Sequence, residues 1–116
     1  MYNYKEIEAD QIEYIAVATV EELGNGQRII LEVDDLSIAI FNIAGQYFAI
    51  ADVCSHDDGP VAEGELSDYQ IECPRHGALF DIKTGKALTL PAVVDIPAYP
   101  VRVEKGEILL GLPVEE

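Results

Sequence analysis

The sequence predicts an all-β domain, and three observations support this prediction. Short runs rich in Val, Ile, Leu, Tyr and Phe recur along the whole chain, and residues typical of turns separate them. The one helix-like piece is Val20–Leu23, which has room for a single turn. At 116 residues, the chain is long enough for one domain with its own core. Many short strands with this punctuation favour an antiparallel β-sandwich or partial barrel.

The first half of the chain contains four predicted strands. Apolar and polar side chains alternate in Leu36–Ile43 with a period near two, which is typical of a half-buried strand. Turn residues at Asp34-Asp35 and Ala44-Gly45 separate this strand from its neighbours. The four predicted strands are Ile12–Val20, Gln27–Val33, Leu36–Ile43 and Gln46–Val53.

The second half has shorter predicted strands and longer connections. Lys105-Gly106 is expected to form a tight turn between the last two strands. The four predicted strands are Tyr69–Glu72, Ala78–Ile82, Tyr99–Glu104 and Glu107–Leu110. The sequence shows no repeat, linker or low-complexity tract, so we expect one domain.

All cysteines and histidines of the chain fall in two short motifs. The first is Cys54-Ser-His56, and the second is Cys73-Pro-Arg-His76. Both motifs lie between predicted strands, at the tips of two loops. Two thiolates and two imidazoles are together a complete set of four metal ligands. The sequence therefore predicts a metal centre with the ligands Cys54, His56, Cys73 and His76.

Two kinds of centre suit these four ligands. Zinc takes a tetrahedral Cys₂His₂ set, but common zinc motifs pair Cys with Cys and His with His along the chain. Here each motif supplies one Cys and one His, so both Cys can reach one iron while both His reach another. This spacing favours a Rieske-type [2Fe–2S] centre, with zinc as the alternative.

The motifs and their surroundings resemble Rieske-type ferredoxins, in particular the small ferredoxin component of bacterial aromatic-ring dioxygenase systems. The similarity runs from about Ile12 to Leu110. The segments that carry it are Cys54–Gly59, Glu63–Leu66, Cys73–Asp81 and Thr84-Gly85. It implies a single Rieske domain over residues 1–116. The basal β part would be about 1–53 and 92–116, with a small cluster-binding insert at about 54–91.

The resemblance also implies the cofactor and its ligands. One [2Fe–2S] cluster is expected, with Cys54 and Cys73 on one iron and His56 and His76 on the other. Leu90-Pro91-Ala92 would form a third loop that covers the cluster.

Four residues near the predicted ligands suggest a low reduction potential. High-potential Rieske proteins join their ligand loops by a disulfide, and the matching residues here are Gly59 and Arg75. Those proteins also place hydroxyl groups near the cluster sulfurs, where this chain has Ala78 and Phe80. Hydrogen bonds to sulfur stabilise the reduced cluster, so their loss lowers the potential. We expect a value on the order of −150 mV, at the low end of the Rieske range.

Glycines and carboxylates beside the motifs are also of interest. Gly59 and Gly77 are expected to allow a backbone conformation or a close approach that a Cβ would block, with packing on the cluster favoured over a plain turn. Asp57 and Asp58 follow His56 and add negative charge, which would lower the potential and could meet a docking partner.

The resemblance implies a one-electron carrier rather than an enzyme. The chain would take electrons from a flavin-dependent reductase and pass them to a terminal oxygenase. It has no further histidines for a mononuclear iron site. Three alternatives stay open: a general Rieske carrier with another client, a redox-sensing module, and a zinc-stabilised binding domain.

Charge and composition exclude several classes of partner. Twenty-two acidic residues outnumber seven basic ones, and the net charge of −15 argues against nucleic-acid binding. It suits docking to a basic partner surface, although solubility alone also explains it. No apolar run is long enough to span a membrane, and no signal-peptide pattern opens the chain. With both cysteines assigned to metal, we expect a cytoplasmic monomer.

Overall fold

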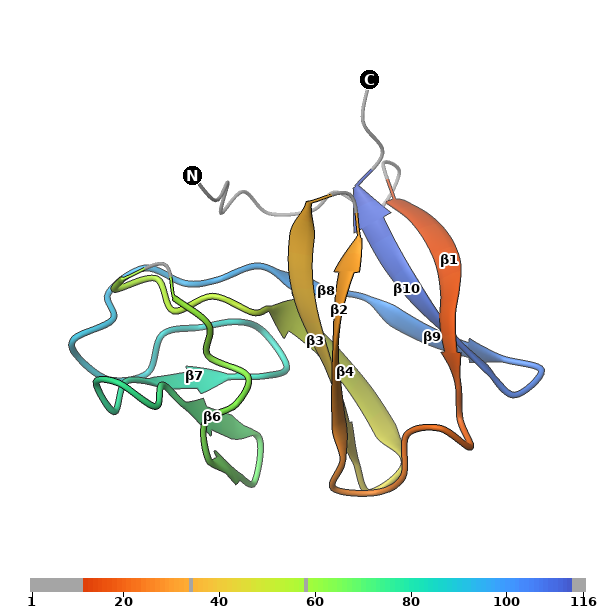
Figure 1. The fold of residues 1–116 in the computed structure, drawn as a ribbon, viewed down its shortest axis with the longest axis horizontal. Helices are drawn as coiled ribbons and strands as arrows, with labels where there is room; N and C mark the ends of the chain where they lie inside the picture. Colours follow the sequence, from red (N-terminus) through yellow and green to blue (C-terminus); the bar gives the residue numbers. More distant parts are fainter. Residues whose placement is uncertain (1–11, 34, 58, 114–116) are drawn as a thin grey trace.

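The computed structural model describes residues 12–33, 35–57 and 59–113. These residues contain ten β-strands and no helix. Every strand pairing is antiparallel. The predicted all-β class is therefore confirmed. Among these residues there is no helix that could cross a membrane. Figure 1 shows three sheets, two of them together and the third set apart.

The first sheet has four strands in the order β2-β3-β4-β8. Its bounds are β2 Arg28–Val33, β3 Leu36–Ile43, β4 Gln46–Ala51 and β8 Ala98–Tyr99. The strand β3 lies in the middle, and Ile38–Phe41 within it are completely buried. A strand with neighbours on both sides and apolar residues on both faces is a natural centre for the core.

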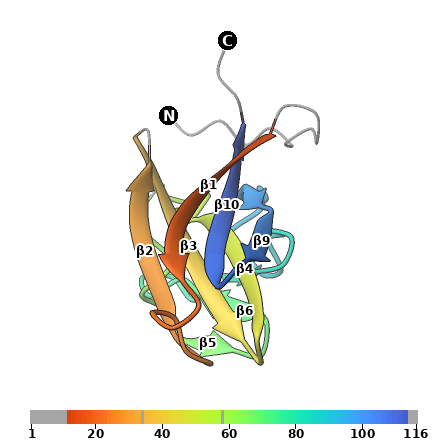
Figure 2. The same cartoon turned by 90° about the vertical axis from the view of Figure 1, so that its right-hand side faces the viewer.

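The second sheet has three strands in the order β1-β10-β9, with bounds β1 Ile12–Thr19, β10 Glu107–Pro113 and β9 Val101–Glu104. It meets the first sheet where β9 contacts β4 and β10 contacts β8. Figure 2 shows β1 and β10 in front of β3 and β4. We call these two sheets, with their seven strands, the basal sheets.

The third sheet is small and lies in the long connection between β4 and β8, which we call the loop end. Its strands are β5 Leu66–Ser67, β6 Gln70–Glu72 and β7 Leu79–Asp81, in that order. Figure 1 shows β6 and β7 on the opposite side of the first sheet from β1 and β10. Ile71, Phe80 and Ile82 are completely buried and belong to the same continuous core as the basal sheets.

Two tight turns join strands of the basal sheets as the sequence predicts. Ala44 and Gly45 both have positive φ, at 53° and 84°, between β3 and β4. Lys105 and Gly106 repeat this pattern at 51° and 78° between β9 and β10. Positive φ at both central residues is the mark of a type I′ hairpin turn, whose twist suits paired strands. At the predicted turn Asp34-Asp35, Asp34 lies outside the described residues, and Asp35 has a positive φ of 68°.

Two details differ from the sequence prediction. The two-residue strand β5 was not predicted, because two residues show no alternation. The predicted strand Tyr99–Glu104 is two strands, since the chain leaves one sheet after Tyr99 and enters the other at Val101. Pro100 marks this change of sheet, because it has no N–H for a ladder. The piece Val20–Leu23 is a single turn, as the sequence predicts, and a 3.1 Å hydrogen bond from Glu22 N to Thr19 O closes it.

Candidate metal centre

The first predicted ligand loop begins where the chain leaves the first sheet. Val53 and Cys54 are completely buried, and the loop then turns outward. The Cys54 N–H donates to Gly59 O at 2.6 Å, and the Asp57 N–H donates to Cys54 O at 3.2 Å. These bonds bring Gly59 and Asp57 back to the cysteine, which lies at the base of the loop.

The second predicted ligand loop has the same form, between β6 and β7. The Cys73 N–H donates to Ala78 O at 2.7 Å, and the Gly77 N–H donates to Cys73 O at 2.9 Å. In both loops the cysteine N–H therefore bonds a carbonyl five residues later. Gly77 has a φ of +74°, a left-handed conformation that residues with a Cβ rarely adopt. The backbone conformation therefore explains Gly77, while its packing on the cluster, which we favoured, stays a prediction.

The structure brings the four predicted ligands together in two chemically alike pairs. Cys54 and Cys73 are 0% and 1% exposed, and the Cys73 thiol lies near enough to Cys54 to help raise the pKa of the Cys54 thiol. His56 and His76 are exposed, with ring centroids 4.7 Å apart and an interplanar angle of 85°. Among the described residues, no three His, Cys, Asp or Glu side chains surround a single point as ligands of one ion.

This arrangement matches the donor set of a [2Fe–2S] centre with mixed ligands. Such a centre needs two thiolates at one iron and two imidazoles at the other, which is how the side chains are paired here. Burial raises the pKa of the Cys54 thiol, and the neighbouring Cys73 acts in the same direction. A coordinating metal deprotonates a thiol outright, so a bound metal would remove this penalty.

Asp57 and Arg75 form an ion pair between the two loops. Arg75 Nε donates to Asp57 Oδ2 at 2.7 Å, and Arg75 Nη2 donates to Asp57 Oδ1 at 2.9 Å. The bonds from Arg75, helped by the Gly59 N–H, hold the pKa of Asp57 well below its usual range. The bond to Asp57 likewise raises the pKa of Arg75 above its usual value. Asp57 is therefore a paired charge. Asp58, which the sequence analysis also singled out, lies outside the described residues.

Two charged residues that the sequence analysis missed bind the segment 61–64, which follows the first ligand loop. Asp52, only 8% exposed, accepts hydrogen bonds at Oδ1 from the N–H groups of Val61 and Ala62, at 2.8 and 2.7 Å. Arg28 Nη1 on β2 donates to the carbonyls of Ala62 and Gly64, at 2.7 and 2.6 Å. For Asp52, the sequence offered one signal of this role, which is its position directly after the apolar strand β4. Acidic residues are seldom buried without a partner.

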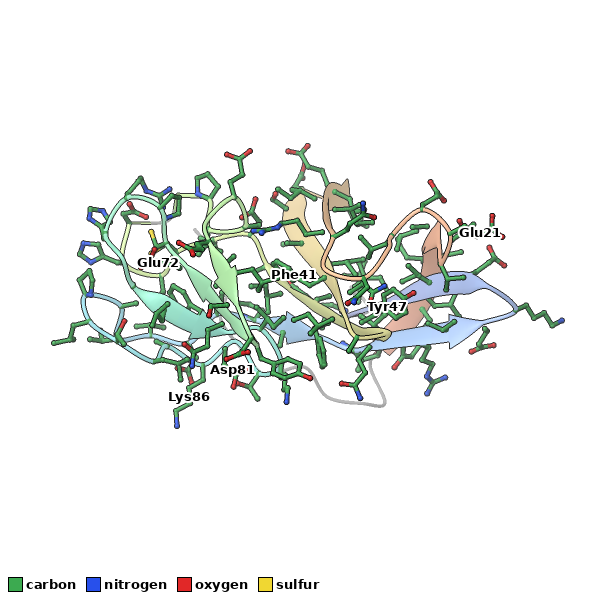
Figure 3. The ribbon with its side chains drawn as sticks, turned by 90° about the horizontal axis from the view of Figure 1, so that it is seen from below. Glu21, Phe41, Tyr47, Glu72, Asp81 and Lys86 are labelled. Carbon is green, nitrogen blue, oxygen red and sulfur yellow. The ribbon has the colours of Figure 1, made fainter. Side chains whose placement is uncertain are left out.

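Arg28 also lies over the Phe41 ring, with its Cζ 5.8 Å from the ring centroid. Figure 3 shows Phe41 where the basal sheets meet the loop end, and Glu72 farther out toward the ligand loops. The guanidinium thus lies at the junction, where a cation over an aromatic face adds a favourable contact.

The third loop lies against the first ligand loop. Ser55, between Cys54 and His56, donates a hydrogen bond from Oγ to Val94 O. The Leu90–Pro91 peptide is cis, and Leu79 N donates to Thr89 Oγ1 at 2.9 Å. The predicted loop around Pro91 is therefore next to the centre, with exposed apolar side chains at Leu88, Leu90, Val93 and Val94.

Ala78 and Phe80, which the sequence analysis singled out for their missing hydroxyls, are completely buried. They flank the base of the second ligand loop, since Ala78 O receives the Cys73 N–H and Phe80 lies in β7. At Gly59, a Cβ would lie 2.7 Å from Arg75 Nη2. The close approach at Gly59 is therefore to the Arg75 side chain, while packing of Gly59 on the cluster, which we favoured, stays a prediction.

Comparison with known proteins agrees with this geometry. Residues 13–100 match the family described as the Rieske [2Fe–2S] domain. The 3-phenylpropionate/cinnamic acid dioxygenase ferredoxin subunit of Escherichia coli K12 is 42% identical over 100 residues, which cover 85% of this chain and 93% of that protein.

Solved structures of ferredoxins also superpose well. The ferredoxin of carbazole 1,9a-dioxygenase from Nocardioides aromaticivorans IC177 has a TM-score of 0.79 at 32% identity, covering 84% of this chain and 95% of that one. A ferredoxin solved in a complex of reduced oxygenase and oxidized ferredoxin of carbazole 1,9a-dioxygenase has a TM-score of 0.80 at 26% identity, covering 89% and 96%.

The family match spans most of the chain, and the ferredoxin relatives are covered almost from end to end. These relatives are electron-carrying components rather than enzymes. The paired thiols and imidazoles provide the donor set that their cofactor requires. The chain therefore belongs to the Rieske [2Fe–2S] domain family, as an electron-carrying ferredoxin with one Rieske-type cluster.

Proposed function

We propose that this ferredoxin shuttles single electrons from a flavin-dependent reductase to the Rieske centre of a terminal ring-hydroxylating dioxygenase. Cys54 and Cys73 would hold one iron of the cluster, and His56 and His76 the other. When bound, the cluster supplies reversible one-electron chemistry. The observation that supports this proposal most strongly is the opposite exposure of the two ligand pairs, with buried sulfurs and exposed imidazoles.

The exposure of the four ligand side chains determines from which side a partner can approach the centre. The buried cysteines keep the inner side of the centre away from water, while the His76 side chain is 39% exposed. A partner that covers the two imidazoles therefore comes closer to the centre than one that docks on the basal sheets. Donor and acceptor would then use the same face in turn, so docking must be brief.

We also propose that the domain divides into a basal part at about 1–53 and 92–116 and a cluster-binding part at about 54–91. In support, β1–β4 and β8–β10 fall in the first part, and β5–β7 fall in the second. The contacts of Asp52 and Arg28 with residues 61–64 would join the two parts.

The face around the imidazoles suits a partner with an apolar centre and a basic rim. Leu90 and Val93 are 76% and 75% exposed, in the loop that Ser55 ties to the first ligand loop. Exposed apolar side chains that gather in one segment can mark a contact site. The net charge of −15 would favour approach by a basic surface. A related ferredoxin is known in complex with its oxygenase, which supports the terminal oxygenase as acceptor.

We place the protein in the cytoplasm, as a monomer. Cys54 and Cys73 are both free thiols, and their commitment to iron would leave no cysteine for a disulfide. A reducing compartment suits such a chain.

The cofactor proposal predicts about two irons and two acid-labile sulfides per chain, which the four ligands require. Iron and sulfide analysis of protein purified without chelators measures this directly. Serine in place of Cys54 or Cys73 should give protein without the visible absorption. Retention of a full cluster in both serine variants would refute the ligand assignment.

Docking can be tested by stopped-flow oxidation of the reduced ferredoxin by purified terminal oxygenases. Val93→Asp should slow transfer to the true acceptor, because it places a charge within the proposed contact face. Ile30→Asp is the matched control, since Ile30 is an exposed apolar residue on β2 of the basal sheets. Equal rates for the two variants would refute the contact face.

The same experiment separates the proposed client from the alternatives. Rapid transfer to a dioxygenase supports the proposal, whereas transfer to a monooxygenase alone would make the chain a carrier with a different client. A stable complex formed in only one redox state, without turnover, would indicate a redox-sensing module.

A further inference from the structure

The two ligand loops are joined by one side chain that the electron-carrying function does not by itself require. We propose that Arg75 is a positioning residue whose guanidinium clamps the first ligand loop to the second, so that cluster retention depends on this clamp. The inference rests on the proposed ligand set, because Arg75 lies between Cys73 and His76 in the second loop.

The contacts of Arg75 all cross to the first loop. Nε and Nη2 bind the two carboxylate oxygens of Asp57, and Nη1 donates to Pro60 O at 2.7 Å. One side chain thus makes three hydrogen bonds to residues 15 and 18 positions away in the sequence. The paired bonds to a carboxylate use the planar fork of the guanidinium, which a lysine ammonium cannot reproduce.

Gly59 makes room for this side chain. A Cβ at Gly59 would lie 2.7 Å from Arg75 Nη2 and 2.8 Å from its Cζ, which is too close for any real contact. Gly59 is not among the glycines with positive φ, so space rather than backbone conformation explains the glycine. Its N–H also donates to Asp57 Oδ1 at 3.0 Å, which fixes the carboxylate that Arg75 binds.

The clamp also reaches a proposed ligand. Asp57 Oδ2 lies 3.0 Å from His76 Nε2. An ionised carboxylate can only accept, so Nε2 would carry the proton and leave the lone pair of Nδ1 for a metal. Arg75 and His76 of the second loop therefore hold the same carboxylate of the first loop, and a movement of either loop would break both contacts.

Charge and geometry can be separated by choice of variant. Arg75→Gln removes the charge and the fork, Arg75→Lys keeps the charge but loses the fork, and Gly59→Ala keeps both charges but obstructs the guanidinium. If Arg75 acts only as a positive charge near the cluster, then only Arg75→Gln should differ from wild type. If it acts as a clamp, all three variants should release the cluster faster.

The experiment follows the loss of visible absorption from the holo protein in excess chelator. We expect Arg75→Gln, Arg75→Lys and Gly59→Ala to lose the cluster about fivefold faster than wild type, as one lost partly exposed bidentate pair would allow. Arg102→Gln is the matched control, because this exposed arginine lies on β9 against Tyr14. It should release the cluster at the wild-type rate.

A double-mutant cycle tests whether the two partners act together. Asp57→Asn should accelerate release as Arg75→Gln does, and the double variant should be no faster than the quicker single variant. The reduction potential gives a second readout, since Arg75→Gln should lower it and Arg75→Lys should leave it near the wild-type value.

Three outcomes would overturn the clamp: wild-type release by both Arg75→Lys and Gly59→Ala, multiplicative effects in the double variant, or equally fast release by Arg102→Gln. Cys73→Ser distinguishes this failure from that of the proposed function. If Cys73→Ser lacks the cluster while Arg75→Lys and Gly59→Ala behave as wild type, only the clamp fails. If Cys73→Ser keeps its cluster, the ligand set itself fails.

Discussion

The basal sheets and the ligand loops are specified by different kinds of interaction. In the basal sheets, β2, β3 and β4 pair over their whole lengths, and Ile38–Phe41 at the centre are completely buried. In the ligand loops, Cys54, Cys73 and Ala78 are buried, but the intervening residues from His56 to Asp57 and from Pro74 to Gly77 are exposed. Individual polar contacts and the bound metal must therefore fix the loops.

This difference teaches where the cluster matters for folding. Apolar burial stabilises the basal sheets whether or not a cofactor is present. The core continues into the loop end through Ile71, Phe80 and Ile82, so the small sheet is partly independent as well. The tips of the two ligand loops lack such support, and there the energy of metal binding is folding energy.

The largest expected effect is that of Cys73→Ser, which removes a proposed ligand. The variant should lack the cluster, and amide exchange should become fast at residues 74–78 because the metal no longer fixes that loop. Amides of Leu36–Ile43 should stay protected, since their partners are in β2 and β4. Exchange measured by NMR or mass spectrometry on wild type and variant would test this. Equal protection of both segments in the variant would contradict it.

A smaller effect is expected where the two regions meet, at Asp52. In Asp52→Ala the buried N–H groups of Val61 and Ala62 lose their acceptor. Each of the two unsatisfied groups costs about 1–3 kcal/mol, so the stability measured by urea unfolding should fall by about 2–6 kcal/mol. Asp52→Asn is the matched control, because its amide oxygen can still accept. A wild-type unfolding midpoint for Asp52→Ala would show that the contact does not join the regions.

The reduction potential should change modestly when hydroxyls are added near the sulfurs. Phe80→Tyr and Ala78→Ser should each raise the potential by about 40 mV, which corresponds to one neutral hydrogen bond of about 1 kcal/mol. Phe48→Tyr, on β4 of the basal sheets, adds the same group away from the loops and should cause no shift. Redox titration followed by EPR would give these values. Unchanged potentials in both loop variants, with the hydroxyls seen at the sulfurs, would remove missing hydroxyls as the cause.

The sequence predicted the basal sheets well because their signals are periodic. Alternation placed β3, and the pairs Ala44-Gly45 and Lys105-Gly106 placed two hairpins that the structure confirms. The predictions failed where no period exists. The strand β5 is too short to alternate, and the change of sheet at Pro100 depends on partners far away in the sequence.

The candidate site shows the same limit. Its cysteines and histidines were found because two rare residue types fall in two motifs. The roles of Asp52, Arg28 and Arg75 were not found, because one charged residue among many gives no signal until its partner in space is known. The ion pair of Asp57 was missed for this reason, and Asp57 was treated as a free docking charge.

The smallest expected effect tests whether the basal sheets can be changed without touching the centre. Ala44 has a φ of 53°, which asparagine adopts more readily than alanine, and Asn-Gly is the preferred pair for this turn. Ala44→Asn should therefore stabilise the protein by about 0.5 kcal/mol in urea unfolding. Lys105→Asn should do the same at the second hairpin, where φ is 51°. Because both turns join strands of the basal sheets, chelator-driven cluster loss should keep its wild-type rate in both variants. Slower cluster loss in proportion to the added stability would mean that the loops open only when the basal sheets unfold, and the two regions would then be a single cooperative unit.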